Sequence, residues 1–292
     1  MKRNNMKNLV AFIAVVCFLI NSAFAQTSSV KEKSLLWKIE GKDLKAPSYL
    51  FGTVHMLARK NFEMSAKATD AMDKTSRVYL EINMAAPNLA EESQKYMMSH
   101  KTISSQIKPE EIALVDEVLG KKLGLTLAQV DKVKPMFLIA MIMQKSFTEP
   151  MASFEEEIIK HTKQQGKTIE GLSSIEEQYS FADKIFETSD FPSYLKSMDE
   201  FDIQSILSHI YQLYKDENIA GMDELLLKYT SSNPETYRQL LPVRNRLWAD
   251  RMPALMNETP TFFAIGSAHL SGEEGVINLL RQKGYTVTPV YN

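Results

Sequence analysis

The stretch "TFFAIGSAHLSGEEGVINLLRQKGYTVTPV", residues 261–290, decides the fold, because it contains strand, helix and strand signals in that order. Its first part is apolar and β-prone as far as Gly266, and "YTVTPV" at its end has the same character. Between them, apolar residues at 276, 277, 279 and 280 recur at helical spacing, and Gly284 is typical of a helix end. Such a unit favours parallel strands joined by a right-handed crossover.

The remaining strand signals cluster near the two ends of the chain. "SYLFGTVH" (48–55) and "RVYLEIN" (77–83) flank a helical stretch, "SLLWKIEG" (34–41) precedes them, and "KTIEGLS" (167–173) stands alone among helical segments. Residues 88–256 otherwise show apolar side chains at steps of three and four. We therefore predict an α/β fold, with a central, mostly parallel sheet built from N- and C-terminal βαβ units and a large helical middle region.

The first 25 residues have the pattern of a secretory signal peptide. "MKRNNMKNLVAFIAVVCFLINSAFAQ" has a basic start, an apolar run from Leu9 to Ile20, and small residues around Phe24 before the expected cut after Ala25. The apolar run is shorter than the roughly 20 residues that span a bilayer. We expect an exported protein, periplasmic or secreted, with no stable membrane anchor after cleavage and with residues 26–292 as one α/β domain.

Composition limits the class of partner. Without the signal peptide the chain has 31 basic and 36 acidic side chains, a net charge of −5, and no cysteine. A protein that neutralises phosphates needs a basic surface, so nucleic acid is not an expected partner. An exported chain without disulfides depends on its apolar core for stability.

Two histidines stand at equivalent places in the predicted sheet. "FFAIGSAHL" ends an apolar strand in Gly266-Ser-Ala-His269, and "YLFGTVHM" ends another in Gly52-Thr-Val-His55. Ligands of parallel sheets sit outside the carboxyl ends of the strands. Ser271 and Glu274 also have capping-box spacing, which places His269 in the turn before a helix. Taken alone, each histidine fits an ordinary loop residue better than a site residue.

Glu81 and Arg244 are the two charged residues that could complete a site. Glu81 lies near the carboxyl end of a strand that we expect beside the one carrying His55; it is either solvated or directed into the same crevice. Two imidazoles and a carboxylate form the ligand set of a catalytic metal site. Arg244 falls on the apolar stripe of "LLPVRNRLWADRM", so it braces a carboxylate such as Glu81, faces a substrate oxyanion, or extends its head to water.

Five segments resemble, in the same order, blocks of the TraB/GumN family, which includes the animal Tiki proteases. They are "YLFGTVHM", "VYLEIN", "GLSSIEEQ", "VRNRLWADRM" and "FFAIGSAHLSGEEGVINLLRQKGYTVTPV". The resemblance implies the α/β fold of erythromycin esterases and haem-binding ChaN-like proteins, and a metal-dependent peptidase activity that uses the paired Gly-x-x-His segments and an acidic residue.

Carried over residue by residue, the resemblance makes His55, Glu81 and His269 the metal site, with Arg244 and Asn245 in support. The sequence departs from the family where Ser173 stands in place of a glutamate; Glu170, three residues earlier, is a candidate substitute. Glu155 occupies a position that is usually aspartate.

The leading hypothesis is an exported, metal-dependent hydrolase that cleaves a peptide or another small molecule. His55, Glu81 and His269 would bind zinc, manganese or cobalt, Glu81 would complete the ligand set or act as general base, and Arg244 would steady an oxyanion. Two alternatives use the same fold: a protein that holds haem, another tetrapyrrole or a metal without turnover, and a metal-free esterase with His55 as general base.

Overall fold

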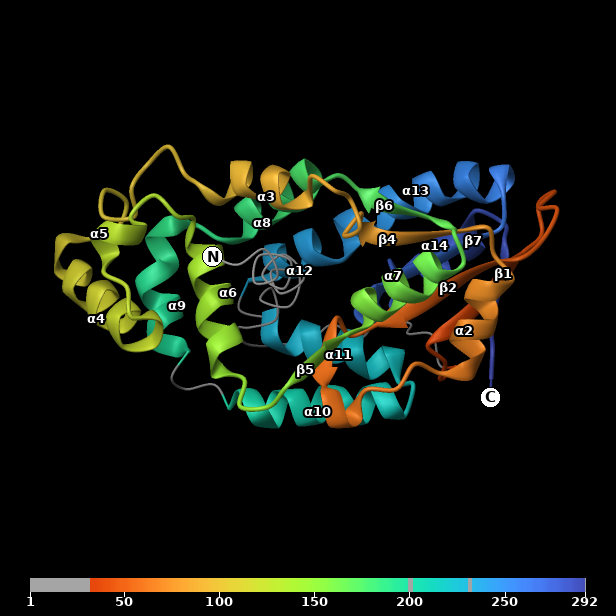
Figure 1. Cartoon of the computed structure of the whole chain (residues 1–292), viewed down its shortest axis with the longest axis horizontal. Helices are drawn as coiled ribbons and strands as arrows, with labels where there is room; N and C mark the ends of the chain where they lie inside the picture. The colour runs from red at the N-terminus through yellow and green to blue at the C-terminus, as the bar shows by residue number, and fades with distance from the viewer. Residues whose placement is uncertain (1–31, 199–201, 231–232, 292) are drawn as a thin grey trace.

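The computed structural model describes residues 32–198, 202–230 and 233–291 (Figure 1). The signal peptide expected at residues 1–25 lies outside these ranges. Within them, no helix is both long and apolar enough to cross a membrane.

A six-stranded sheet forms the centre of the α/β fold, as the sequence predicts. Its strands follow the order β6-β4-β7-β2-β1-β8. The first four are parallel, whereas β1 runs antiparallel to both of its neighbours. The bounds are β6 (Thr168–Ser173), β4 (Arg77–Ile82), β7 (Thr261–Gly266), β2 (Ser48–Thr53), β1 (Leu36–Glu40) and β8 (Thr286–Pro289).

The strand order differs from the expected one at β7. The prediction that the strand of Glu81 neighbours the strand before His55 is wrong, because β7 lies between them and pairs with both β4 and β2. All six residues of β7 are buried, so this fully buried strand takes a central place in the sheet. β8 likewise runs in the same direction as β7 but pairs with β1 at the edge.

Helices surround the sheet and extend beyond one end of it. Their bounds are α2 (Ala66–Asp73), α3 (Leu89–Met97), α4 (Ile112–Leu123), α5 (Leu127–Val130), α6 (Pro135–Ser146), α7 (Phe154–Gln164), α8 (Ile175–Ile185), α9 (Phe191–Ser197), α10 (Ile203–Lys215), α11 (Ile219–Thr230), α12 (Pro234–Leu240), α13 (Pro242–Glu258) and α14 (Val276–Gln282). A small second sheet pairs β3 (Met56–Ala58) with β5 (Met151–Ser153).

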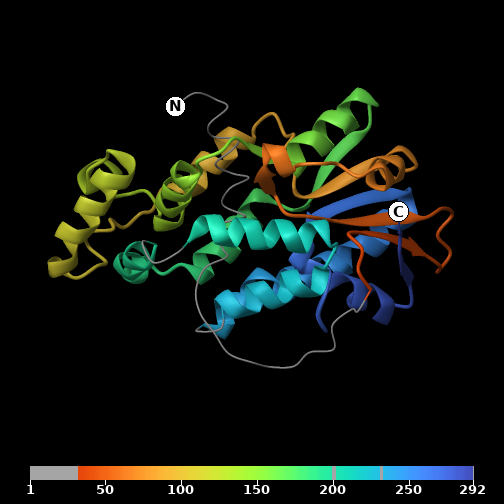
Figure 2. The same cartoon turned by 90° about the horizontal axis from the view of Figure 1, so that it is seen from below.

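The buried apolar residues form two main clusters. One surrounds the central sheet and contains Trp37, Phe262 and Trp248. The other contains Val115 and Phe137 and lies among α4, α5, α6 and α9, which gather at the end of the molecule away from the sheet (Figures 1 and 2). The middle region of the chain therefore packs partly on the sheet and partly on itself.

The carboxyl ends of β2, β7 and β4 meet at one edge of the sheet, because these strands are parallel neighbours. β2 leads to His55, β7 leads to the 3₁₀ turn Ser267–His269, and Glu81 is the last residue but one of β4. The fold thus brings to one edge three residues that lie far apart in sequence.

Candidate functional site

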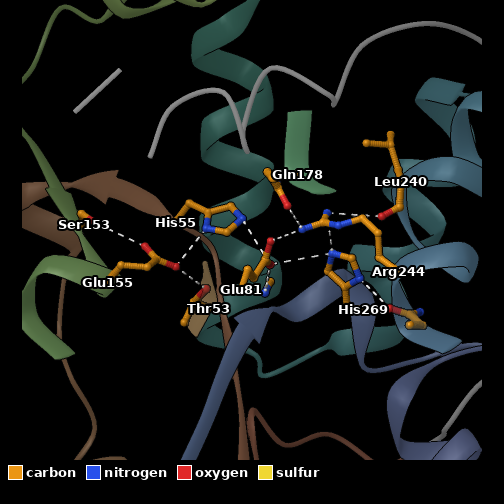
Figure 3. A network of polar contacts seen from close by, with 11 residues as sticks. Thr53, His55, Glu81, Ser153, Glu155, Gln178, Leu240, Arg244 and His269 are labelled. Carbon is orange, nitrogen blue, oxygen red and sulfur yellow. Dashed lines mark hydrogen bonds and ion pairs between the residues drawn. The ribbon is translucent and has the colours of Figure 1, made fainter. Parts of the chain in front are cut away.

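His55 is held by a carboxylate. Its backbone has φ +50°, a left-handed conformation that is uncommon outside glycine and recurs at functional sites. Its Nδ1 atom lies 2.9 Å from Oε1 of Glu155. Because a carboxylate only accepts hydrogen bonds, Nδ1 is the donor and Nε2 is left facing the centre of the site (Figure 3).

Glu155 is placed by the start of α7. Ser153 caps this helix, so Glu155 lies in its first turn, where it is 5 % exposed. Its Oε1 also accepts a hydrogen bond from Thr53 Oγ1 at 2.9 Å, and Oε2 accepts one from Ser153 Oγ at 3.2 Å. Burial alone lowers the pKa of His55, but the charge and hydrogen bond of Glu155, aided by Glu81, raise that pKa to about 9.

Glu81 is the centre of the cluster. Its carboxylate is buried; Oε1 accepts the Gly266 N–H at 2.8 Å, and Oε2 pairs with Arg244 Nη2. The Nε2 atoms of both His55 and His269 lie 3.8 Å from Oε1. Burial favours the neutral acid, but the charges of Arg244 and His55 outweigh it and lower the pKa of Glu81. The reading of Glu81 as a solvated strand residue is therefore wrong.

Arg244 braces this carboxylate from α13. It is 6 % exposed, so its head does not reach water. Besides Glu81, it donates to Gln178 Oε1 at 3.0 Å and to the Leu240 carbonyl at 3.3 Å, and its guanidinium lies 4.6 Å from the centroid of the Trp248 ring. Of the three arrangements that the sequence left open, the structure contains the ion pair with Glu81.

His269 has partners on both ring nitrogens. Arg244 Nη1 lies 3.2 Å from Nε2, which must accept because a guanidinium only donates. Nδ1 therefore carries the hydrogen and donates to Asn245 Oδ1 at 2.6 Å, while the Asn245 amide donates to the Glu274 carbonyl at 2.8 Å. Burial and the Arg244 charge hold the pKa of His269 well below its ordinary value, so this imidazole is neutral.

The turn after His269 differs from the expected capping box. α14 begins at Val276 with Gly275 as its N-cap, and no side chain caps it. Ser271 Oγ has no hydrogen-bond partner within the described part of the chain, and the Glu274 side chain pairs with Arg246. The chain turns at Gly272, which has φ +86°, and α14 begins only after this turn. His269 therefore lies in the separate 3₁₀ turn Ser267–His269 that precedes it.

The two glycines of the paired Gly-x-x-His segments have different packing roles. A Cβ atom on Gly52 would lie 3.0–3.2 Å from Ser267 and Leu270, so this glycine lets β2 approach the turn that carries His269. A Cβ atom on Gly266 would lie 3.3 Å from Glu81 Oε1 and 3.4 Å from His55 Nε2. The absent side chain at 266 therefore leaves room in the middle of the site.

Two of the three expected metal ligands are placed so that they could bind a divalent cation. His55 Nε2 and Glu81 Oε1 face each other with the Gly266 space beside them. His269 Nε2 faces the same oxygen, but its lone pair accepts from Arg244. Among the described residues, no group of three or more His, Cys, Asp and Glu side chains has the geometry of a metal centre. A three-ligand site requires Arg244 to release the His269 nitrogen.

Sequence reasoning missed two of the residues in this cluster and named one substitute that fails. The sequence marked Glu155 only as a departure from the family, although this residue shares a face of α7 with buried Ile158. It did not single out Gln178, which accepts a hydrogen bond from Arg244. Glu170 is exposed and pairs in register with Tyr79, so it does not replace the missing glutamate. Ser173 instead accepts the Trp248 indole N–H at 2.8 Å and thereby orients the ring that packs on Arg244.

The site opens into a cavity of about 80 Å³. Its floor includes Thr53, His55, Arg244 and His269, and its walls are mostly apolar side chains of α6, α10 and α11. Fold and site together define an α/β protein with a buried histidine–carboxylate cluster at the carboxyl ends of parallel strands.

The sequence matches the model of the TraB/PrgY/gumN family over residues 35–289, and the chain belongs to this family. Comparison with curated proteins found no match, and comparison with solved structures found none.

Proposed function

We propose that this protein is a metal-dependent hydrolase that cleaves peptides and that acts after export, in a periplasm or outside the cell. The observation that carries this proposal is the pair His55 Nε2 and Glu81 Oε1, which lie 3.8 Å apart beside the space left by Gly266. Below its pKa of about 9, His55 carries a proton on Nε2 that faces the Glu81 carboxylate, and a divalent cation would take the place of this proton. Family membership is consistent with the proposal.

Each residue of the site would have its own role in this function. His55, Glu81 and, once freed from Arg244, His269 would hold a zinc, manganese or cobalt ion, which supplies Lewis acidity and lowers the pKa of a bound water. Glu155 keeps the Nδ1 hydrogen of His55 in place, so Nε2, once it releases its proton, would present its lone pair to the cation. Arg244 carries a buried positive charge, which favours an oxyanion that develops beside it.

Metal content and peptide cleavage test this proposal together. The purified mature protein is expected to contain one equivalent of metal and to cleave a mixed peptide substrate, with cleavage lost in chelator and restored by zinc, manganese or cobalt. His55→Ala should lose both metal and activity. The matched control His209→Ala, on the exposed side of α10, should lose neither. Full activity in chelator would contradict metal dependence.

A second candidate is a metal-free hydrolase in which His55 is the general base. The observation that favours it is the hydrogen bond from Arg244 to His269 Nε2. This bond occupies the lone pair of His269, so two of the three expected metal-ligating atoms are left. With a His55 pKa of about 9, the base form grows as pH rises, so activity in chelator should increase up to about pH 9. Tetrapyrrole binding is not favoured, because 80 Å³ is below the about 300–1,000 Å³ of common ligand pockets.

A further inference from the structure

The cavity above the candidate site has two chemically distinct parts. Its floor contains the polar cluster, and its walls contain Met143 of α6, Phe147 directly after α6, Ile206 and Leu207 of α10, and Leu226 of α11. A group that touches these walls therefore lies next to whatever is bound at His55 and Glu81.

The apolar face of α10 lines this cavity. Of this helix, only Tyr214 is buried, although apolar residues recur along it at helical spacing. Ile203, Ile206 and Leu207 line the cavity and belong to none of the apolar clusters of the described chain. Apolar side chains gain stability when apolar surface is taken from water, so this face favours an apolar occupant.

Charge and size narrow the occupant further. Among the described lining residues, the ionisable ones are His55, His269 and Arg244, and Arg244 is already paired with Glu81. A charged group against the apolar walls would lose its hydration without a partner. The cavity of about 80 Å³ is also smaller than the engineered cavity of about 150 Å³ that admits benzene. A small aliphatic group matches this volume better than an aromatic ring does.

We infer that the substrate carries an aliphatic side chain, of the size of valine or leucine, next to the bond that is cleaved, and that α6, α10 and α11 select it. This inference rests on the proposed hydrolase function, but selective binding of an aliphatic group in the cavity does not require turnover. Because a hydrophobic pocket discriminates by about tenfold or more for each methylene, leucine should be preferred to alanine and to lysine by at least about tenfold.

Binding is measured separately from cleavage with ¹³C-methyl-methionine NMR of the mature protein. Met143 and Met222 line the cavity, so their methyl signals, assigned with Met143→Leu and Met222→Leu, report its occupancy. N-acetyl-leucinamide should shift both signals at concentrations at which N-acetyl-phenylalaninamide and N-acetyl-lysinamide do not. Equal shifts with all three probes, or none with the leucine probe, would overturn the inference.

A matched pair of leucines on α11 tests the walls. Leu226 lines the cavity, whereas Leu225, also buried, does not. Leu226→Ala should enlarge the cavity and raise the preference for the phenylalanine probe over the leucine probe by at least about tenfold. Leu225→Ala should leave this ratio unchanged. Because a ratio within one variant does not depend on the fraction folded, a loss of stability does not mimic the effect.

Cleavage of peptides that differ only at one position separates this inference from the proposed function. Selective binding without cleavage of any peptide supports the cavity and contradicts the hydrolase. Cleavage without preference for valine or leucine supports the hydrolase and overturns the cavity's role. If the protein shows neither selective binding nor cleavage, the result contradicts both the cavity's role and the hydrolase function.

Discussion

The Nδ1 atom of His55 lies 2.9 Å from Oε1 of Glu155, a residue 100 positions further along the chain. This contact joins the end of β2 to the first turn of α7 and sets which imidazole nitrogen faces the site. It is also the largest favourable contribution to the raised pKa of His55. The protonation of His55 is therefore controlled by a residue outside the proposed metal ligands.

Glu155→Gln should lower the pKa of His55. The substitution removes the negative charge but keeps an amide oxygen, so the lowering effect of burial is less opposed and the pKa should fall from about 9 by about one to three pH units. An NMR titration of the His55 imidazole measures this. Glu156→Gln is the control, because Glu156 is the next residue of the same helix and is exposed. A pKa that stays at about 9 in Glu155→Gln would contradict this reading.

Gly266→Ala should remove activity while leaving the fold intact. Gly266 has φ −54°, which alanine adopts without strain, but the new methyl would lie 3.3–3.4 Å from Glu81 Oε1 and His55 Nε2. Small displacements of reacting groups cost about 100-fold in rate, so a loss of at least that size in kcat/KM is expected. Circular dichroism melting and peptide cleavage measure the two effects.

The control for this methyl is Gly120→Ala. Gly120 lies within α4, and a Cβ there meets nothing within 4 Å. This variant should keep full activity and gain about 1 kcal/mol of stability from helix propensity. Retained activity in Gly266→Ala would show that the space beside Gly266 is not used.

Arg244→Met should destabilise the protein through the carboxylate that it leaves behind. Glu81 is 7 % exposed, and without Arg244 its buried charge loses its main partner, at a cost of about 3 kcal/mol or more in the free energy of unfolding. The double variant Glu81→Gln/Arg244→Met removes both charges and should recover part of that loss. Urea unfolding of both single variants and the double variant gives the coupling energy; additive losses would contradict a coupled pair.

The elements of this fold are visible in local sequence patterns, but the order of its strands is not. "TFFAIG" and "RVYLEI" are apolar enough to predict β7 and β4 from a few residues each. Which strand lies between which depends on long-range burial: β7, buried along its whole length, takes the place beside β2 that adjacency in the chain suggested for β4.

The candidate site shows the same division between local and long-range information. His55, His269 and Glu81 are recognisable because each interrupts or follows an apolar strand, and Arg244 because it occupies an apolar helical face. Glu155 was one of three consecutive glutamates, and its contact with His55 spans 100 residues. A single sequence contains no local signal for such a pairing.

Asp223→Asn should stabilise the protein at high pH and not at low pH. Asp223 is 3 % exposed in α11, its Oδ1 accepts the Tyr237 hydroxyl hydrogen at 2.7 Å, and its Oδ2 lies where a Cβ atom on Gly272 would clash. Burial raises its pKa to about 7; Tyr237 opposes this rise and the nearby Glu224 adds to it. The native state therefore holds the proton more tightly than the unfolded chain, whose aspartate pKa is about 3.9.

The stability that this proton contributes is fully present below about pH 4 and is lost as pH rises through about 7. Asparagine stays neutral and keeps an oxygen that accepts from Tyr237. The free energy of unfolding of Asp223→Asn should therefore exceed that of the unchanged protein by up to about 4 kcal/mol at pH 8 and equal it at pH 4. Urea unfolding at pH 4, 6 and 8 measures the difference. The exposed Asp216→Asn is the control and should show no such trend. An equal gain at all three pH values would show that packing, rather than the buried charge, distinguishes the two side chains.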